Sequence, residues 1–370
     1  MSRETTRRKA DHIRISLTKN VNARRTTTGF EDIAFVHRAL PGIEKQKIDT
    51  STAVFNHRFR APLIVGAITG GTKEAAKINA TIAEAVEKLG LGMGVGSQRA
   101  AVEKKHLEDT FSSARKTAPN TFLIANLGGV QLVNGYGIKE VRTIMDMIDA
   151  DALAIHLNAL QEAVQPEGQT NFGGVLAEIG DISKSLGKPV IVKETGAGIA
   201  AEEAVKLENV GISGIDISGA GGTSWAGVEY YRTEGKKDIV QRKLGEVFWD
   251  WGIPTVASLV EVLQSVNVPV IASGGVRDGL DIAKAVSLGA SLTSFSQPAL
   301  HAAVKGTREV ENLLSLSIEE LKTAMFLVGA DSLQHLRKTP IILLGKTSKW
   351  LNARGFDVHN YARRGRSQSS

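Results

Sequence analysis

The chain has 370 residues, of which 42% are hydrophobic, so it is long enough to bury one large core or two ordinary ones. It holds no cysteine, which excludes disulfides, thiolate metal sites and a cysteine nucleophile, and it holds no apolar run near the roughly 20 residues of a membrane helix. Its N-terminus lacks the apolar stretch of a signal peptide, so we expect a cytoplasmic protein, and its net charge of +6 favours anionic ligands or partners.

Short apolar runs recur along the chain, with helical patterns between them. The runs are nearly continuous rather than alternating, which is typical of strands that are covered on both faces. Eight such runs separated by amphipathic segments predict an α/β fold, a closed (β/α)8 TIM barrel, with an open doubly wound sheet as the alternative. The expected strands are residues 62–68, 91–96, 122–127, 152–157, 189–194, 214–218, 269–275 and 291–296.

We divide the chain into three segments around this barrel. Residues 1–60 form an N-terminal segment and cap, in which "FVHRAL" and "TAVFNHRF" are expected to be antiparallel. Residues 61–345 form the barrel, with a helical pattern from about residue 300 onward, and residues 346–370 form a C-terminal tail. A long insertion, residues 219–267, follows the sixth strand. Long loops at the carboxyl ends of strands carry the active sites of barrel enzymes, so the insertion is expected to contribute to one.

Polar and glycine residues gather where the expected strands end. The fourth strand delivers His156 and Asn158, which share a face through the two-residue period of a strand, and Gln161 and Glu162 then turn over its end. In a closed barrel all eight carboxyl ends face one mouth, so we expect one shared ligand site. The other strand ends supply Ala67, Thr69, Ser97, Arg99, Asn126, Lys193, Ser218, Thr223, Gly275, Arg277, Ser296 and Gln297.

Three features at these ends indicate an anionic ligand. Gly274 and Gly275 after strand seven, and "GAGGTS" after strand six, would let backbone N–H groups approach a phosphate, although tight turns alone would also explain such glycines. Lys193 lies in an apolar strand and needs an anionic partner; its neighbour Glu194 points to the opposite face, so a ligand is the expected partner. Arg99 is interpreted as a phosphate clamp, with a surface arginine as the alternative.

Several motifs occur together in one order over roughly residues 8–300. They are "RKADHI", "APLIVGAITGG", "GVGSQRA", "IANLGG", "HLNALQEAVQPEGQTNF", "VKETGAG", "DISGAGGTSWAGVE" and "IASGGVRDGLD". Together they resemble type 2 isopentenyl diphosphate isomerase, the flavin-dependent form, with an archaeal character. The block after strand four and the N-terminal Arg-Lys pair are more specific to that family than the glycine motifs, which many FMN barrels share.

The resemblance implies an isomerase of isoprenoid biosynthesis that interconverts isopentenyl and dimethylallyl diphosphate over reduced FMN with Mg2+ and without net redox change. It also implies NAD(P)H as the reductant and a homotetramer or octamer. The implied catalytic residues are Gln161 and Lys193, and the implied metal ligand is Glu162. Substrate binding would fall to Arg8, Lys9, His12, Ser97, Arg99, His156, Asn158 and Gln161. FMN binding would fall to Ala67, Ile68, Thr69, Ser97, Asn126, Lys193, Ser218, Thr223, Gly275, Val276, Arg277, Ser296 and Gln297. Ser296 and Gln297 depart from the Ala-Gly pair that is more usual in the family.

The chemistry of the reaction gives independent reasons for such a site. Moving the double bond requires a proton to be added at one carbon and removed at another, through a cation-like state that needs a dry pocket. Ordinary side-chain acids protonate an alkene poorly, whereas a reduced flavin is a plausible acid–base group. One carboxylate with diphosphate oxygens and waters suits Mg2+, which rarely needs a full protein cage.

Other interpretations of these residues stay open at this point. Glu162 could be a first-turn helix acid, His156 a satisfied core histidine, and Arg8 and Lys9 a solvated basic tail. If the tail instead binds substrate, we expect the N-terminus to fold over the mouth. One competing function is an FMN-dependent dehydrogenase or oxidase on the same barrel, but no His-Gly-x-Arg pattern occurs near the late strands. Another is a basic non-catalytic barrel that binds nucleic acid, but aromatic and basic residues do not interleave, so we expect no nucleic-acid partner. We expect no membrane partner either, because no long apolar run occurs.

Overall fold

The structure, a computed structural model, describes residues 2–234 and 238–365. Its centre is a closed barrel with the strand order β10-β11-β4-β5-β6-β7-β8-β9, in which every pairing is parallel. The ring closes where β11 pairs with β4, so the predicted (β/α)8 barrel is confirmed over the open sheet. The eight strands are β4 (Leu63–Val65), β5 (Gly92–Gly94), β6 (Phe122–Gly128), β7 (Ala152–His156), β8 (Val190–Lys193), β9 (Gly214–Asp216), β10 (Val270–Ala272) and β11 (Leu292–Phe295).

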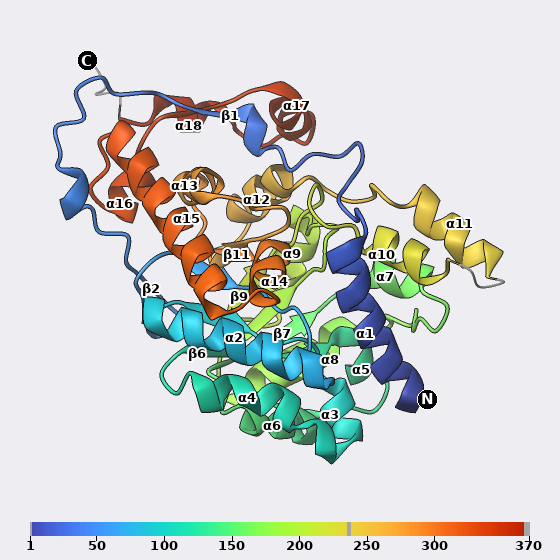
Figure 1. The fold of residues 1–370 in the computed structure, drawn as a ribbon. Coiled ribbons are helices and arrows are strands. Elements are labelled where there is room, and N and C mark those ends of the chain that lie inside the picture. Colours follow the sequence, from blue (N-terminus) through green and yellow to red (C-terminus); the bar gives the residue numbers. More distant parts are fainter. Residues whose placement is uncertain (1, 235–237, 366–370) are drawn as a thin grey trace.

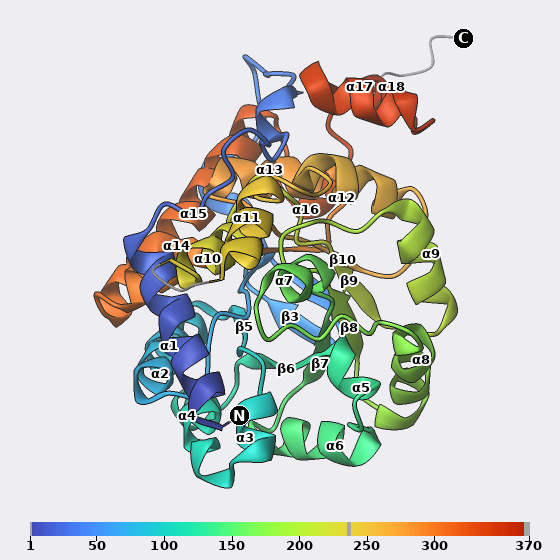
Figure 2. The same ribbon diagram turned by 90° about the vertical axis from the view of Figure 1, so that its right-hand side faces the viewer.

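Helices surround the ring of strands on its outside (Figures 1 and 2). Their ends follow local chemistry: α2 begins where the Thr72 hydroxyl accepts from Ala75 N–H, and it ends at Gly90, whose φ is 64°. The helices of the barrel region are α2 (Lys73–Leu89), α3 (Arg99–Glu103), α4 (Asp109–Thr117), α5 (Gly129–Leu132), α6 (Ile138–Met147), α7 (Ala159–Val164), α8 (Val175–Leu186), α9 (Ala201–Asn209), α12 (Thr255–Leu263), α13 (Gly279–Leu288) and α14 (Gln297–Ala303), with the 3-10 turn η3 (Lys105–Leu107).

A β-hairpin closes the end of the barrel where the strands begin. It consists of β2 (Thr52–Val54) and β3 (His57–Phe59), and its two turn residues, Phe55 and Asn56, have φ values of 54° and 59°, as a two-residue hairpin turn requires. The Phe59 ring lies where a side chain at Gly92 would stand, and Phe55 does the same at Gly214. The hairpin therefore fills this end with aromatic rings and leaves the opposite end for a ligand.

Part of the expected cap and the chain after residue 300 differ from the sequence interpretation. The stretch "FVHRAL" contributes only Phe35 to a strand, β1 (Ile33–Phe35), and that strand pairs with β12 (Ile341–Leu343) rather than with the hairpin. The expectation of an unbroken helical pattern to about residue 345 was therefore wrong. The remaining outer elements are the turns η1 (Phe30–Asp32) and η2 (Lys45–Lys47) and the helices α15 (Thr307–Leu327), α16 (Leu333–Leu336), α17 (Gly345–Ala353) and α18 (His359–Arg363).

The C-terminal segment is folded as far as the structure describes it. Leu351, Val358 and Tyr361 are buried, and Arg364 donates to the carbonyl of Ser287. These contacts place α17 and α18 against the barrel. The last residues of the expected C-terminal tail, 366–370, lie outside the described residues.

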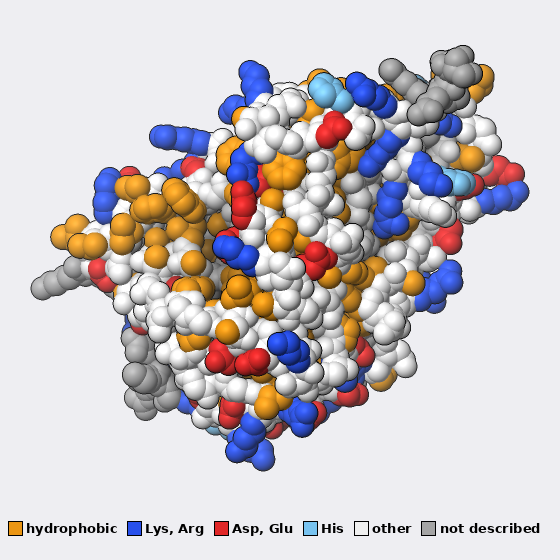
Figure 3. Space-filling view, turned by 180° about the vertical axis from the view of Figure 1, so that it is seen from behind, with side chains coloured by type: hydrophobic (Ala, Val, Ile, Leu, Met, Phe, Trp, Pro, Cys, Tyr) orange, Lys and Arg blue, Asp and Glu red, His pale blue; other side chains and the backbone are white. Residues whose placement is uncertain are grey.

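Two segments lie over the open end of the barrel. The insertion after β9 holds α10 (Trp225–Arg232) and α11 (Ile239–Val247), and the N-terminal helix α1 (Ser2–Thr18) packs beside α10 and α14 (Figure 2). Hydrophobic side chains are exposed at the edge that α11 forms, where Ile239 is 79% exposed (Figure 3). Among the described residues, no helix is both long and apolar enough to cross a membrane.

Candidate active site

One cavity of about 240 Å3 opens at the carboxyl ends of the barrel strands. The lining comes from the ends of the strands, from the start of the insertion and from one face of α1. Every residue that the sequence assigned to a site contributes to this lining, so the structure brings the whole predicted set together, as follows: Arg8, Lys9, His12, Ala67, Ile68, Thr69, Ser97, Arg99, Asn126, His156, Asn158, Gln161, Glu162, Lys193, Ser218, Thr223, Gly275, Val276, Arg277, Ser296 and Gln297.

The helix α1 presents Arg8, Lys9 and His12 to the cavity, so this basic pair is not a solvated tail. Lys9 Nζ donates to the carbonyl oxygen of Ser97, 2.5 Å away, at the end of β5. Burial, together with the neighbouring Arg8 cation, lowers the pKa of Lys9 to about 7, although Glu103 opposes the change. An anion placed beside Lys9 would restore its charge.

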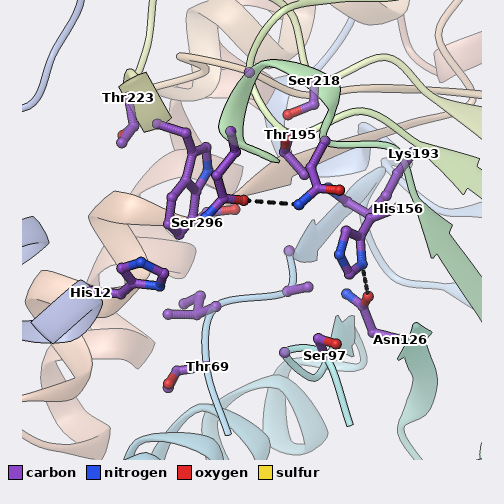
Figure 4. Close-up of a pocket in the computed structure, with 18 of the residues that line it drawn as sticks. His12, Thr69, Ser97, Asn126, His156, Lys193, Thr195, Ser218, Thr223 and Ser296 are labelled. Carbon is purple, nitrogen blue, oxygen red and sulfur yellow. Dashed lines mark hydrogen bonds between the residues drawn. The ribbon is translucent and has the colours of Figure 1, made fainter. Parts of the chain in front are cut away.

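His156 ends β7 and contacts the adjacent strand β6. Its Nδ1 lies 2.7 Å from Asn126 Oδ1 on β6, a contact that Figure 4 shows on the side of the cavity opposite His12. Burial, and after it the cations Lys193, Lys9 and Arg8, lower the pKa of His156 to about 3. The imidazole is therefore neutral in the ligand-free protein, and its ring contributes hydrogen bonding rather than charge.

The short helix α7 carries the polar residues that follow strand β7. Asn158 Nδ2 donates to Glu162 Oε1 at 2.9 Å and lies 3.2 Å from Gln161 Oε1. The other carboxylate oxygen, Glu162 Oε2, accepts from Gln165 Nε2 and from the backbone N–H of Gln169, both at 2.6 Å. Glu162 is thus a buried, oriented carboxylate at the cavity wall rather than a solvated helix acid, and Oε1 keeps a free lone pair for a further ligand.

Lys193 stands at the carboxyl end of β8 and faces the cavity, as the strand period predicted. Glu194 points away and accepts the backbone N–H groups of residues 195–197, while burial raises its pKa to about 7. Across the ladder from Lys193 lies Asp216, whose carboxylate accepts from Ser273 Oγ. Burial raises the pKa of Asp216, and the nearby Lys193 charge opposes that rise.

The two glycine turns after β9 and β10 form one structure rather than two phosphate sites. Gly274 and Gly275 have φ values of 95° and 73°, and their backbone packs directly on Gly219 and Gly222, where any Cβ would collide with main-chain atoms. Beside them Arg277 donates to Gln297 Oε1 at 3.2 Å and to Asn22 Oδ1 at 3.3 Å.

This corner fits the phosphate of FMN. Within the described part of the chain, the backbone N–H groups of Gly275 and Val276 have no protein acceptor, and both residues line the cavity beside the Arg277 guanidinium. Unpaired N–H groups and a guanidinium are the donor set that a phosphate requires.

Sequence reasoning missed a group of residues on α10 and the ends of β9 and β10. Trp225 and Asp216 line the cavity, and Glu229, which is fully buried, lies with Oε1 2.8 Å from His12 Nε2 and 3.4 Å from Gln161 Nε2. Burial alone would raise the pKa of Glu229, but His12, Arg232 and Gln161 together lower it. The available signal was a pair of opposite charges, three positions apart, inside an aromatic-rich segment of the insertion.

Comparisons with known proteins agree with this site. A family model described as FMN-dependent dehydrogenase matches residues 1–125 and 139–343. An isopentenyl-diphosphate delta-isomerase of Methanothermobacter thermautotrophicus is 50% identical over 357 residues, which are 96% of this chain and 99% of the relative. The protein of the same name from Pyrococcus furiosus is 48% identical and covers 97% of this chain and 92% of the relative.

Solved structures of two oxidases share the fold. A mandelate oxidase matches with a TM-score of 0.62 at 18% identity over 92% of this chain and 98% of that one. A putative lactate oxidase of Pediococcus acidilactici matches with a TM-score of 0.65 at 16% identity over 93% of each chain. At these identities the similarity concerns the fold alone.

The barrel and the family match define an FMN-dependent protein of the FMN-dependent dehydrogenase class. Within that class, the identity with full-length relatives is decisive: the chain belongs to the flavin-dependent, type 2 family of isopentenyl-diphosphate delta-isomerases.

Proposed function

We propose that this chain interconverts isopentenyl diphosphate and dimethylallyl diphosphate, over reduced FMN, with Mg2+ and without net redox change. The observation that carries the proposal is the grouping of cations at one part of the cavity, beside uncharged polar groups. Arg8, Lys9 and Arg99 line the same cavity as neutral His156 and the amide of Gln161. A diphosphate bound by the cations would hold its hydrocarbon end against groups that carry no charge.

The cations would bind the diphosphate and fix its position in the cavity. Arg8 and Lys9 come from α1 and Arg99 from the first residue of α3, so the diphosphate would join the N-terminal helix to the barrel. Ser97 and Asn158 add polar contacts, and His156 can donate from its ring only through a nitrogen that Asn126 does not already occupy. Because these donors are fixed on different elements, they would hold the five-carbon chain in one orientation.

Gln161 is the residue that we assign to the reacting carbons. Its amide is held between Asn158 and Glu229, so it has a fixed orientation without carrying a charge of its own. A neutral amide tolerates a developing cation nearby and does not trap it covalently. Trp225 and the helix α1 would limit the access of water to this part of the cavity.

Reduced FMN supplies the acid–base chemistry that no side chain in the cavity supplies, because an alkene is too weakly basic for ordinary acids. The chain's own contribution is to bind and tune this group. The Gly275–Arg277 corner with Ser296 and Gln297 would hold its phosphate, and Lys193 would place a positive charge that stabilises an anionic ring. Asp216 lies across the ladder from Lys193, and the Lys193 charge opposes the rise that burial causes in the pKa of Asp216.

Glu162 is the residue that we assign to Mg2+. The described residues contain no group of three or more acidic or imidazole side chains arranged to hold a metal ion, so any metal here would depend on a single carboxylate, substrate oxygens and water. The free lone pair of Glu162 Oε1 fits such a site, since Oε2 is already occupied by Gln165 and Gln169.

The competing function is an FMN-dependent dehydrogenase or oxidase. One experiment separates the two: the purified protein is loaded with FMN, reduced, and given isopentenyl diphosphate and Mg2+ without any electron acceptor. We expect the dimethylallyl isomer to form only after reduction, with no net oxidation of the flavin. Turnover that requires oxidised FMN and consumes electrons would refute the proposal.

Four further expectations belong to the same proposal. NAD(P)H serves as the reductant, the protein is cytoplasmic, and it assembles as a homotetramer or octamer. The division into an N-terminal segment of residues 1–60, a barrel of residues 61–345 and a C-terminal segment is retained. The exposed apolar side chains of α11 support self-association, which light scattering on the FMN-loaded protein would measure.

A further inference from the structure

Five side chains joined by four ion-pair contacts lie beside the cavity; we call them the ring, because both ends of the series lie on α1. Two of its members have no role in the proposed chemistry. The ring runs through Arg8, Glu167, Arg232, Glu229 and His12. Arg8 and His12 are four positions apart on α1, so they face the same side of that helix. The ring therefore begins and ends on α1 and crosses α10 and the loop after α7 between those points.

Each contact in the ring joins different elements of the fold, except one. Glu167 Oε1 lies 3.8 Å from Arg8 Nη1, and its other oxygen forms a short contact with Arg232 Nη2. Arg232 Nη1 lies 3.1 Å from Glu229 Oε2 within α10, and Glu229 Oε1 lies 2.8 Å from His12 Nε2. Glu167 is thus the single carboxylate that links Arg8 on α1 to Arg232.

The inner members of the ring are removed from water, whereas Glu167 is not. The side chains of Arg232 and Glu229 are 4% and 0% exposed, and that of Glu167 is 26% exposed. Several polar atoms of the ring have no well-aligned hydrogen bond among the described residues, namely Glu167 Oε1, Glu229 Oε2, and Nε and Nη1 of Arg232. The ring is held by charge pairing, and loss of one member leaves a buried partner uncompensated.

We propose that Glu167 and Arg232 are positioning residues that latch α1 onto the barrel, and so hold Arg8 and Lys9 at the cavity before substrate arrives. The consequence for substrate binding rests on the proposed function; the attachment of α1 does not. Lys9 also donates to the backbone carbonyl of Ser97, and this hydrogen bond does not involve Glu167.

The latch and simple electrostatics predict opposite effects of removing Glu167 on substrate affinity. If Glu167 were only a negative charge near the diphosphate, its removal would strengthen binding of an anion. If Glu167 is the latch, its removal frees α1 from this link and leaves Glu229 as the carboxylate that pairs with Arg232. Substrate binding then weakens, because the energy of ordering α1 must come from the substrate contacts.

The test compares Glu167→Gln with the control Glu234→Gln in FMN-loaded protein. Glu234 pairs with Lys19, the residue that follows α1, at 3.3 Å, but this pair is largely exposed and lies outside the ring. We expect Glu167→Gln to raise KM for isopentenyl diphosphate about 10-fold with kcat within about 2-fold, and to speed amide exchange in α1 by about 10-fold without substrate. The control should change each value by less than about 2-fold, and Glu167→Asp, which keeps the charge, should recover part of the loss.

The outcomes separate the latch from the proposed function. An unchanged or lowered KM, or unchanged exchange in α1, would overturn the latch, and so would an equal loss of FMN affinity, which would indicate general damage. If the wild-type protein does not isomerise the substrate, the function falls but the exchange measurement still decides the latch. Arg232→Met, which removes the charge but keeps the stem, should reproduce the exchange result of Glu167→Gln if it folds.

Discussion

Lys9 should make substrate binding depend on pH. In the empty protein its pKa is about 7, against an ordinary value of 10.5, because burial and Arg8 disfavour the charged form. The sign follows directly: Lys9 is charged below this pH and mostly neutral above it. A diphosphate beside the amine favours the charged form, so binding must be accompanied by proton uptake whenever the pH lies above about 7.

The magnitude follows from the size of the shift. At pH 8 only about one molecule in ten would carry the charge before binding, and each further pH unit would cost about 1.4 kcal/mol, or tenfold in affinity. Substrate affinity should keep falling with pH until the pH nears the ordinary pKa of a lysine, because the bound anion would raise the pKa of Lys9 toward that value. Loss of the Arg8 charge should raise the pKa of Lys9 and move the start of the dependence to higher pH.

The assay is titration of the FMN-loaded protein with isopentenyl diphosphate between about pH 7.5 and 9.5, where the substrate's own ionisation changes little. Calorimetry in buffers of different ionisation enthalpy counts the protons. We expect about one proton to be taken up by the wild-type protein and none by Lys9→Arg, whose guanidinium stays charged throughout. Equal slopes and equal proton uptake in both proteins would refute the assignment of the pH dependence to Lys9.

Four other changes, three substitutions and one deletion, test the remaining assignments. Glu162→Gln should raise the Mg2+ concentration for half-maximal turnover at least tenfold while leaving FMN affinity within about 2-fold, and an unchanged Mg2+ requirement would contradict the metal role. Lys193→Ala should weaken FMN binding, measured by fluorescence titration, or make reduction of the bound FMN harder, measured by redox titration. Gln161→Ala should lower kcat at least about 100-fold while FMN stays bound. Deletion of residues 1–12 should damage substrate affinity far more than FMN binding; equal loss of both would contradict a substrate-specific role of α1.

The barrel could be predicted because its signal is local. Each strand is buried on both faces, so it appears as a continuous apolar run, as in Leu123, Ile124 and Ala125 of β6. The cavity followed from topology alone: once the strands are parallel and closed, their carboxyl ends must converge, and the residues there line one site. Strand positions in the chain were therefore enough to bring His156 and Lys193 together.

The parts that could not be predicted depend on contacts between distant segments. The strand β12 has only three residues, and it exists because β1, about 300 positions earlier, offers a partner edge. Glu229 and Arg232 read as ordinary charges of an amphipathic helix, since only the packing of α10 under α1 buries them. The two glycine motifs looked like separate phosphate sites because sequence does not show that Gly222 packs on Gly275.

The pairing of the cations explains why one of them, rather than another, should titrate. Arg8 and Arg99 each face a carboxylate in the ligand-free protein, Glu167 at 3.8 Å and Glu103 at 2.7 Å. Lys9 has no carboxylate within ion-pair distance among the described residues and donates instead to a carbonyl, which a neutral amine can also do. A buried arginine stays charged and so requires a counter-charge, whereas a buried lysine can give up its proton. Without substrate, Lys9 therefore loses its proton more readily than an ordinary lysine, and it takes up a proton again when the anionic substrate binds.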